Sequence, residues 1–392
     1  MRKIILFTGG VETLDYFSLQ LGQAFEAMGH EVLIFDFRTE EQSYLELLNF
    51  FVKDNTVMIS FNFSGIRGDD IFFDEEGNLF WDTHHIPCYN IIVDHPFYYH
   101  EHLRRRPMDY YQFCIDRDHV YYMKRFFPEV TTAFLPSAGT SLMSGDAYLP
   151  LNERTMDLIF TGNYTPPKAF DKHITRIDEE YTAFYRSIID SLRADPSQTM
   201  EYVFERFLTK EMGRLSSEEL KKCMENMIFL DLYVRFHFRG EVIRTLVDAG
   251  FQVHVFGHGW KQLECLHPEN LIDGSSLDSQ GCLQKISEAK ISLNVMPWFK
   301  DGAHDRIFNS MLNGALCLSD DSRYLREEFH DDTELKFYSL SELWKLPDMV
   351  GSLLKHTDRM ERIMKAGYQK ASHDHTWAQR ASVLSRMIEE KA

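Results

Sequence analysis

The sequence predicts an α/β protein made of two doubly wound, Rossmann-like domains, and three observations carry this prediction. Short apolar runs of strand length alternate with longer segments of helical length over much of the chain. Glycine-containing turns follow several of these runs, as in FTGG at 7–10 and FGHG at 256–259. The chain has 392 residues, a length typical of two domains.

The first domain is expected to span residues 1–150. It opens with an apolar run at 3–8, an amphipathic segment at 16–28 and a second apolar run at 32–37. This order predicts a βαβ unit at the start of a parallel sheet. The later strand-like runs are 56–62, 88–93, 111–115 and 132–135.

A new apolar run at 156–161 starts the second domain, which is expected to span 151–375. The stretch 168–244 is rich in charged residues and helix formers and has no clear strand, so we expect a helical insertion there. Strand-like and helical segments then alternate again. Residues 376–392 are expected to form a helical tail.

The composition excludes several classes of partner. The net charge of −18 argues against binding to the phosphates of nucleic acid, which requires clustered Lys and Arg. No apolar stretch reaches the ~18 residues of a membrane span. The first apolar run is too short for a signal peptide, and the six cysteines form no CxxC pair. We therefore expect a cytoplasmic protein with no membrane span and no nucleic-acid partner.

The richest candidate site is the stretch 289–321, which reads as strand, loop, helix, glycine, strand and acidic turn. The helix starts near Arg306, and its free N–H groups and dipole favour a bound diphosphate. Arg306 adds a forked positive charge, while Asn309 is placed one turn later to bind a ribose hydroxyl. Gly314 is expected to end the helix in a left-handed conformation. The plain alternative is a capped helix start with a surface arginine.

This stretch resembles the C-terminal domain of the CgeB/YkvP-like glycosyltransferases, bacterial relatives of the large glycosyltransferase family 1/4 group. That branch often has the His-Asp-Arg type seen here at His304, Asp305 and Arg306. In the wider group two glutamates eight positions apart flank the helix start, whereas this sequence has Asp301 and Asn309 there. The resemblance implies that His304, Asp305 and Asn309 contact the donor.

The resemblance extends through 157–163 and 253–260, and it covers most of 156–375 apart from the helical insertion. The motifs FTGGVETLDYF and VDHP connect the first domain to the same group more loosely. The resemblance implies the GT-B architecture, in which two doubly wound domains face a cleft.

The sequence and the resemblance together predict a metal-independent glycosyltransferase of the hexosyltransferase type. Its donor would be a UDP- or dTDP-sugar, bound as substrate with no cofactor, and its acceptor a glycan, a protein or a small molecule. Two alternatives use the same fold: a non-catalytic nucleotide- or glycan-binding protein, and a sugar-nucleotide epimerase. An epimerase would process its nucleotide sugar without an acceptor.

Glycine-containing turns at strand ends supply the other candidate donor contacts, because a backbone without side chains approaches a ligand closely. Each turn also has a simple structural interpretation as a tight turn. The resemblance places the turn at 257–260 beside the nucleotide. The candidate residues are Gly9, Gly10, Gly162, Asn163, Gly257, His258, Gly259 and Trp260.

His95 follows the apolar run 91–93 and is a candidate general base for an acceptor hydroxyl or a ligand of the transferred sugar. The alternative is an ordinary turn histidine before a proline. Asp116 and Asp118 form a DxD pattern, which holds a divalent metal in other glycosyltransferases, but Asp118 precedes a helical run and is expected to cap it. The predicted catalytic residues are therefore His95 and Arg306, and no metal site is expected.

Overall fold

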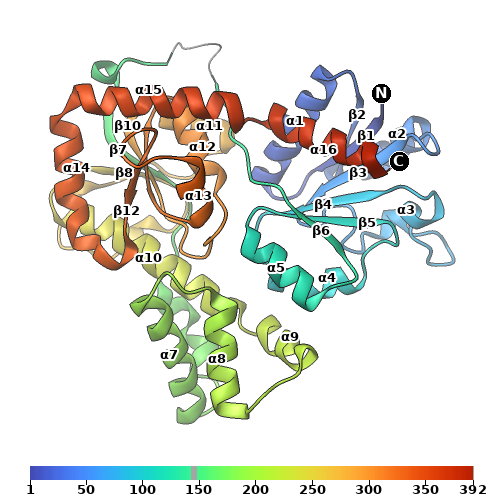
Figure 1. Cartoon of the computed structure of the whole chain (residues 1–392), viewed down its shortest axis with the longest axis horizontal. Helices are drawn as coiled ribbons and strands as arrows, with labels where there is room; N and C mark the ends of the chain where they lie inside the picture. Colours follow the sequence, from blue (N-terminus) through green and yellow to red (C-terminus); the bar gives the residue numbers. More distant parts are fainter. Residues whose placement is uncertain (143–147, 392) are drawn as a thin grey trace. The chain divides into compact units, whose positions relative to one another are not determined.

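The computed structural model describes residues 1–142 and 148–391 (Figure 1). It divides into two compact units. The first contains Met1–Ala138 and His375–Ala392, and the second contains Gly139–Asp374. The sequence-based limits, 1–150 and 151–375 with a tail at 376–392, differ from this division because the C-terminal helix belongs to the first unit.

The first unit is built on a six-stranded sheet with the order β2-β1-β3-β4-β5-β6. All of its strand pairs are parallel, with Ile5 of β1 opposite Leu33 of β2 and Met58 of β3. The strands are β1 (Lys3–Thr8), β2 (Glu31–Asp36), β3 (Thr56–Phe61), β4 (Cys88–Ile92), β5 (Tyr110–Cys114) and β6 (Thr131–Phe134).

The helices of the first unit cover this sheet and include the C-terminal one. Trp377 at the start of α16 contacts Phe17 of α1, with ring centroids 5.0 Å apart. The guanidinium group of Arg380 donates to the carbonyl of Ser137, which joins α16 to the end of the unit's first segment. The helices are α1 (Glu12–Ala27), α2 (Glu40–Phe50), α3 (Phe80–Thr83), α4 (His100–Arg104), α5 (Arg117–Phe126) and α16 (Trp377–Lys391).

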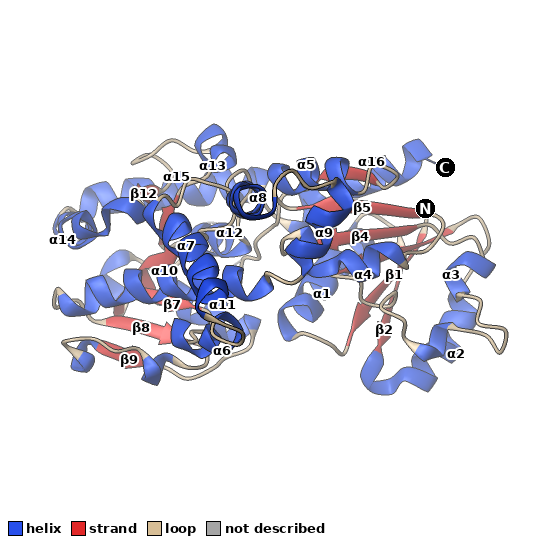
Figure 2. Cartoon of the chain, turned by 90° about the horizontal axis from the view of Figure 1, so that it is seen from below, coloured by secondary structure: helices blue, strands red, loops and turns tan. Residues whose placement is uncertain are grey.

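The second unit contains a six-stranded parallel sheet with the order β12-β11-β10-β7-β8-β9. Its strands lie between helices in Figure 2. The strands are β7 (Met156–Thr161), β8 (Val253–Phe256), β9 (Leu271–Asp273), β10 (Ala289–Asn294), β11 (Leu316–Asp320) and β12 (Lys336–Tyr338). The helices outside the insertion are α11 (Ser279–Ser287), α12 (Asp305–Leu312), α13 (Arg323–Glu328), α14 (Leu346–Lys355) and α15 (Thr357–Asp374).

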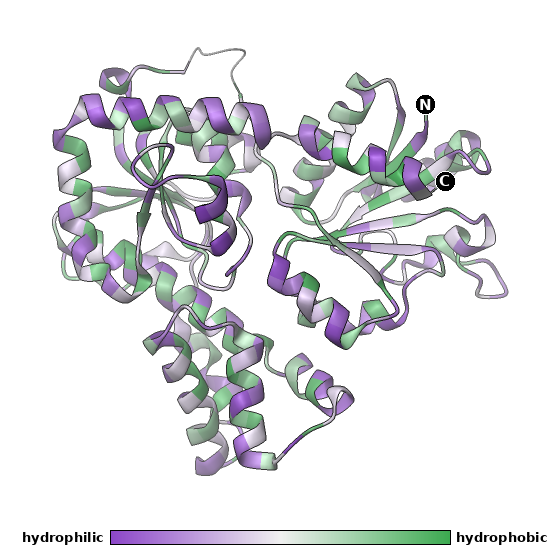
Figure 3. Cartoon of the chain, viewed as in Figure 1, coloured by the Kyte–Doolittle hydropathy of each residue, from purple (hydrophilic) through white to green (hydrophobic). Residues whose placement is uncertain are grey.

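The stretch 168–244 is helical and contains no strand among its residues, all of which the structure describes. Each of its longer helices shows both hydrophobic and hydrophilic residues in Figure 3, as expected for helices that bury one face. The helices are α6 (Asp171–Ile174), α7 (Glu179–Ala194), α8 (Met200–Met212), α9 (Ser217–Glu225) and α10 (Ile228–Asp248). The last of them, α10, runs back to the sheet and ends shortly before β8.

The predicted fold class, two doubly wound α/β domains, is confirmed. In a parallel sheet the carboxyl ends of neighbouring strands lie along one edge, where ligands bind. In the second unit this edge brings together the segments that follow β7, β8 and β10. No helix among residues 1–142 and 148–391 is long and apolar enough to cross a membrane.

Candidate functional site

The turns after β7 and β8 are joined to each other by hydrogen bonds. The N–H of Gly162 donates to the carbonyl of Phe256 at 2.8 Å, and the N–H of His258 donates to Oδ1 of Asn163 at 2.9 Å. Gly257 has φ +148°, a conformation that residues with a side chain rarely adopt. The sequence predicted these glycine turns separately, and the structure brings them together at one strand edge.

Trp260 lies beneath these turns and is fully buried. Its Nε1 donates to the carbonyl of Gly162 at 2.8 Å, and its ring stacks on Tyr164 with centroids 5.1 Å apart. Gly259, at φ +88°, leaves no room for a side chain because an added Cβ would lie 2.0 Å from the carbonyl oxygen of Tyr164. Trp260 therefore supports the turn from below, which is the structural interpretation of this motif.

The close approach of the two turns makes Gly257→Ala strongly destabilising. An added Cβ would lie 2.4 Å from the carbonyl oxygen of Gly162, so we expect a loss of about 3 kcal/mol in the free energy of unfolding. Gly250→Ala is the matched control, since Gly250 also has positive φ, +94°, but faces open space and should cost about 1 kcal/mol. Urea unfolding of both variants measures the difference, and equal losses would contradict this account of the turns.

Helix α12 begins at the same edge, with His304 as its N-cap. His304 Nδ1 lies 2.8 Å from the Asp305 carboxylate and 3.4 Å from the N–H of Arg306. One nitrogen cannot donate and accept at once, and the shorter contact favours Nδ1–H donating to Asp305. Burial, and then the charge of Arg306, lower the pKa of His304 below its ordinary value. His304 is therefore neutral at pH 7.

The sequence predicted that Asn309 binds a ribose hydroxyl, and in the structure its side chain is hydrogen-bonded within the fold. Its Nδ2 donates to Asp305 at 2.9 Å, and its Oδ1 accepts the N–H of Thr140 at 2.9 Å. These contacts tie α12 to the segment that precedes the second sheet. The amide thus has partners on both sides within the fold, and the expected ribose contact stays a prediction.

Gly314 lies at the C-terminal end of α12, away from His304. It has φ +69°, and its N–H donates to the carbonyl of Met311, which confirms the predicted left-handed helix end. An added Cβ would lie 2.5 Å from the ring of Tyr148 and 2.6 Å from the guanidinium group of Arg154. Gly314 is thus needed for packing, and its expected place among the donor contacts is corrected.

Arg306 points across the strand edge and is 7% exposed. Its Nη1 donates to Oδ1 of Asn294 at 2.9 Å, and its guanidinium carbon lies 4.9 Å from the ring centroid of Phe160. Gly162 makes room for it, since an added Cβ would lie 3.1 Å from Arg306 Nη2. The sequence placed Arg306 at the helix start correctly, but the alternative of a surface arginine is wrong.

Arg239 of α10 joins this site, and sequence reasoning missed it. It is 7% exposed, its Nη1 donates to the carbonyl of Asn163 at 2.6 Å, and its guanidinium carbon lies 5.5 Å from the same Phe160 ring. Its Nε has no hydrogen-bond partner within the described residues. Arg239 lies in the charged helical insertion with no motif around it, so only the tertiary structure reveals it.

The two arginines form a buried cationic pair, and the acidic charges that act on them, Asp305 on Arg306 and Asp231 on Arg239, do so without a direct ion pair. Neither Arg239 nor Arg306 makes an ion pair with an acidic side chain in the described part of the chain. Burial is the main cause that lowers the pKa of both guanidinium groups, and the charge of Arg306 further lowers that of Arg239. Two buried like charges cost free energy unless an anion compensates them. The pair therefore favours an anionic ligand.

The turn at Gly9 and Gly10 belongs to the other unit. Their N–H groups donate to the carboxylate of Asp15 at 2.9 and 3.2 Å. An added Cβ on Gly9 would lie 2.8 Å from Asp36, and its φ is +95°. These amides were expected to contact donor phosphates; in this fold they donate to Asp15, and the phosphate contact stays a prediction.

His95 is 1% exposed and packs against rings of its own unit. Its ring centroid lies 4.5 Å from that of His119 and 4.8 Å from that of Tyr122. His95 Nδ1 accepts the N–H of Phe97 at 3.2 Å, which assigns the ring proton to Nε2.

The DxD pattern contains a helix cap, but the cap is Asp116 and not Asp118 as predicted, because α5 begins at Arg117. Asp116 is the N-cap of α5 and accepts the N–H of Asp118 at 2.7 Å. Among the residues that the structure describes, no group of three His, Cys, Asp or Glu side chains is arranged to hold a metal ion.

Residues 239–386 match a family whose description is glycosyl transferase-like. No curated protein matches the sequence. The fold is similar to an alpha-glucosyltransferase in complex with UDP, with a TM-score of 0.55 and 12% identity over 99% of this chain and 100% of that one. It is also similar to a T4 phage BGT mutant in complex with UDP-glucose, at a TM-score of 0.52 and 12% identity over 99% of both chains.

Sucrose-phosphate synthase from Thermosynechococcus elongatus has a TM-score of 0.50 and 11% identity, covering 100% of this chain and 99% of that one. At such identities the likeness shows the fold. The family match and these folds together support a glycosyltransferase of the GT-B type, while the CgeB-like assignment stays a prediction. The chain therefore has the GT-B fold, and its residues 239–386 are similar to the glycosyl transferase-like family.

Proposed function

We propose that this protein is a metal-independent glycosyltransferase whose second unit binds the diphosphate of a nucleotide sugar between Arg239 and Arg306. The single observation that carries the proposal is this buried pair of guanidinium groups, neither of which makes a direct ion pair with a carboxylate in the described part of the chain. A diphosphate supplies the missing negative charge. The forked donors of the two arginines suit phosphate oxygens.

The same pair explains how the sugar would be transferred. As the bond between the sugar and the phosphate breaks, negative charge builds up on the leaving diphosphate. Guanidinium groups that are already oriented, by Asn294 for Arg306 and by Asn163 for Arg239, stabilise this charge without rearranging. Burial strengthens the interaction because little water screens it. The two arginines thus supply the positive charge that a divalent cation provides in other diphosphate sites.

The nucleotide of the donor is proposed to be UDP or dTDP. Two proteins of similar fold were determined with UDP or UDP-glucose, which makes UDP the first probe. On the phosphate side, Gly162 leaves room for Arg306, since an added Cβ would lie 3.1 Å from its Nη2. On the base side, the segment after β9 runs beside Gly257, whose N–H donates to the carbonyl of Ser275 at 3.1 Å.

The acceptor is a glycan, a protein or a small molecule. His95 stays a prediction for this part of the reaction. With its proton on Nε2, it is suited to donating a hydrogen bond to a sugar hydroxyl rather than to removing a proton. A nucleotide-binding protein without turnover and a sugar-nucleotide epimerase share the same donor site, and only an assay with acceptors separates them.

The first experiment is thermal unfolding of the full chain with 1 mM UDP, dTDP or UMP, each with and without EDTA. A ligand that binds the folded state raises the melting temperature. We expect UDP or dTDP to raise it by about 5 °C and UMP to raise it much less, because UMP lacks the second phosphate. EDTA should change nothing. No shift with any diphosphate would overturn the donor site.

Arg239→Met tests whether Arg239 contributes to UDP binding, because it removes the charge and keeps an unbranched side chain. We expect its affinity for UDP to fall about tenfold to 100-fold, as for the loss of a charged hydrogen-bond donor. Arg154→Met is the matched control. Arg154 is also a buried arginine, 4% exposed, but it donates to the carbonyls of Ala289 and Leu149 within the fold. Its variant should be less stable and still bind UDP normally.

A further inference from the structure

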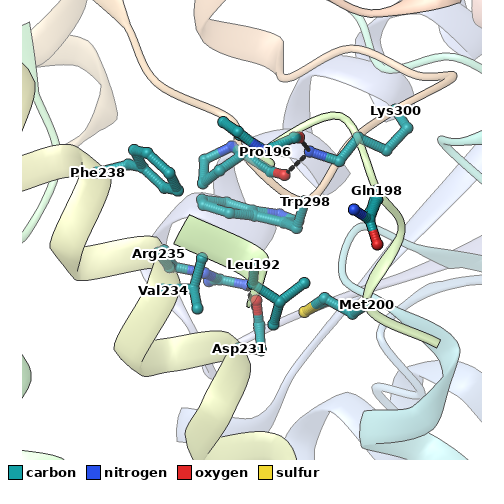
Figure 4. A pocket seen from close by; sticks show the side chains of 11 residues that line it. Leu192, Pro196, Gln198, Met200, Asp231, Val234, Arg235, Phe238, Trp298 and Lys300 are labelled. Carbon is teal, nitrogen blue, oxygen red and sulfur yellow. Dashed lines mark hydrogen bonds and ion pairs between the residues drawn. The ribbon is translucent and has the colours of Figure 1, made fainter. Parts of the chain in front are cut away.

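The helical insertion contacts the loop between β10 and α12 through Arg235 and Trp298 (Figure 4). We call this contact the joint. The guanidinium carbon of Arg235 lies 4.0 Å from the ring centroid of Trp298, within the range of a cation–π contact. Arg235 Nη2 also donates to Asp231 at 3.0 Å. On the loop side, Lys300 Nζ donates to the carbonyl of Pro196, the residue that follows α7 and Asp195.

Ring contacts connect the joint to the start of α12. Trp298 is 6% exposed and Phe299 is 1% exposed, so the loop is packed rather than free. The rings of Trp298 and Phe299 are 5.7 Å apart, and those of Phe299 and His304 are 6.2 Å apart. His304 is the N-cap of the helix that carries Arg306. Two ring contacts therefore connect Trp298 to the first turn of the helix that carries Arg306.

Helix α10 carries both Arg235, which contacts the loop, and Arg239, which lies at the anion site. Asp231, Arg235 and Arg239 are spaced by four residues and lie on one face of the helix. Arg235 holds the loop, and Arg239, one turn later, is one of the two cations of the anion site. The insertion thus contacts the phosphate site directly through Arg239 and indirectly through the loop.

A cavity of about 10 Å³ lies beside the joint, between Gln198 and Trp298. Trp298 Nε1 is a buried donor and Gln198 Oε1 a buried acceptor, and neither has a hydrogen-bond partner among the described residues. A space of this size is at the lower limit for one water molecule, which would need such polar neighbours. One bridging water would connect the loop to the segment between α7 and α8.

We propose that Trp298 and Arg235 are positioning residues, which let the helical insertion hold the 295–304 loop and so set the geometry of the donor-phosphate site. This inference rests on the proposed function for its ligand, a nucleoside diphosphate. Neither residue touches the phosphates. They act through His304 and the first turn of α12.

The test compares Arg235→Met with Arg186→Met in the full chain. Arg186 is the matched control because it also pairs with a carboxylate, Asp171 at 2.8 Å, and lies over a ring, Tyr233 at 5.8 Å, yet touches only the insertion. We expect Arg235→Met to bind UDP about tenfold more weakly and Arg186→Met to bind it as the wild type does. Hydrogen exchange of the 296–304 amides should be faster only in Arg235→Met.

Trp298→Phe is a second variant, which keeps an aromatic face for Arg235. We expect it to lie between the wild type and Trp298→Leu in UDP affinity. Equal loss of affinity in the two Met variants, or unchanged affinity and loop exchange in Arg235→Met, would overturn the proposal. If the wild type itself does not bind UDP, the proposed function fails, and the loop exchange still decides whether the joint holds the loop.

Discussion

Replacing Arg306 by Met is expected to lower the affinity for UDP about 100-fold and the rate of sugar transfer by about two to three orders of magnitude. The physical reason is that its guanidinium group is buried, oriented by Asn294 and adjacent to Arg239, and that Asp305 acts on it without a direct ion pair. The charge is therefore available to the ligand, because no direct ion pair within the protein uses it. The effect on the rate exceeds the effect on affinity because the leaving diphosphate gains charge as the bond breaks.

Isothermal titration with UDP, and release of UDP from UDP-glucose, measure the two effects. Arg306→Lys should recover part of the affinity, since it keeps the charge but loses the forked geometry. The melting temperature serves as the check on folding, because the Met variant leaves Oδ1 of Asn294 without this donor. Unchanged UDP affinity in a folded Arg306→Met protein would remove Arg306 from the site.

Asp320→Asn is expected to raise the stability of the protein at pH 8 more than at pH 5. Asp320 ends β11, is 3% exposed, and accepts the N–H of Met296 at 2.9 Å. Burial raises its pKa from the ordinary 3.8 to about 7. The folded chain therefore retains a proton that the unfolded chain releases near pH 4. This contribution to stability is complete below that pH and is lost as the pH rises through about 7.

The asparagine keeps an oxygen for Met296 and carries no charge at any pH. The difference in unfolding free energy between variant and wild type should therefore grow with pH, by about 4 kcal/mol in total for a shift of about three pKa units and by about 2.5 kcal/mol between pH 5 and pH 8. Urea unfolding at pH 5 and pH 8 measures it. Asp157→Asn is the control, since Asp157 is half exposed and pairs with Lys290 on the surface. A difference for Asp320→Asn that is the same at both pH values would show that this carboxyl is not buried as described.

Both sheets were predictable because their signals are local. An apolar run followed by a glycine turn and an amphipathic segment recurs along the chain, and each such unit folds into a strand, a turn and a helix. The same reasoning located the helical insertion, the left-handed end of α12 at Gly314 and, two residues from its place, the helix cap in the DxD pattern. Each of these depends on residues that are neighbours in the sequence.

The candidate site was predicted only in part, because its contacts join distant segments. Arg239 meets the carbonyl of Asn163 across 76 positions of sequence, with no motif to mark it. The N–H groups of Gly9 and Gly10 were suited to binding phosphate, but they donate to the carboxylate of Asp15. Asn309 suited ribose by its place on the helix, yet Thr140, 169 positions away, uses its side chain. Hydrogen-bonding capacity is visible in a sequence, but the partner that satisfies it is not.

By itself, the sequence determined the two doubly wound sheets, the helical insertion and the placement of Arg306 at a helix start, because periodicity and turn chemistry act over short distances. Only the tertiary structure decided that α16 returns to the first unit, that Trp260 supports a turn from below, and that Arg239 completes a cationic pair with Arg306. Burial and charge compensation depend on which segments meet in space. The chain's acidic total of −18 gave no sign that two of its cations would be buried together without a direct ion pair.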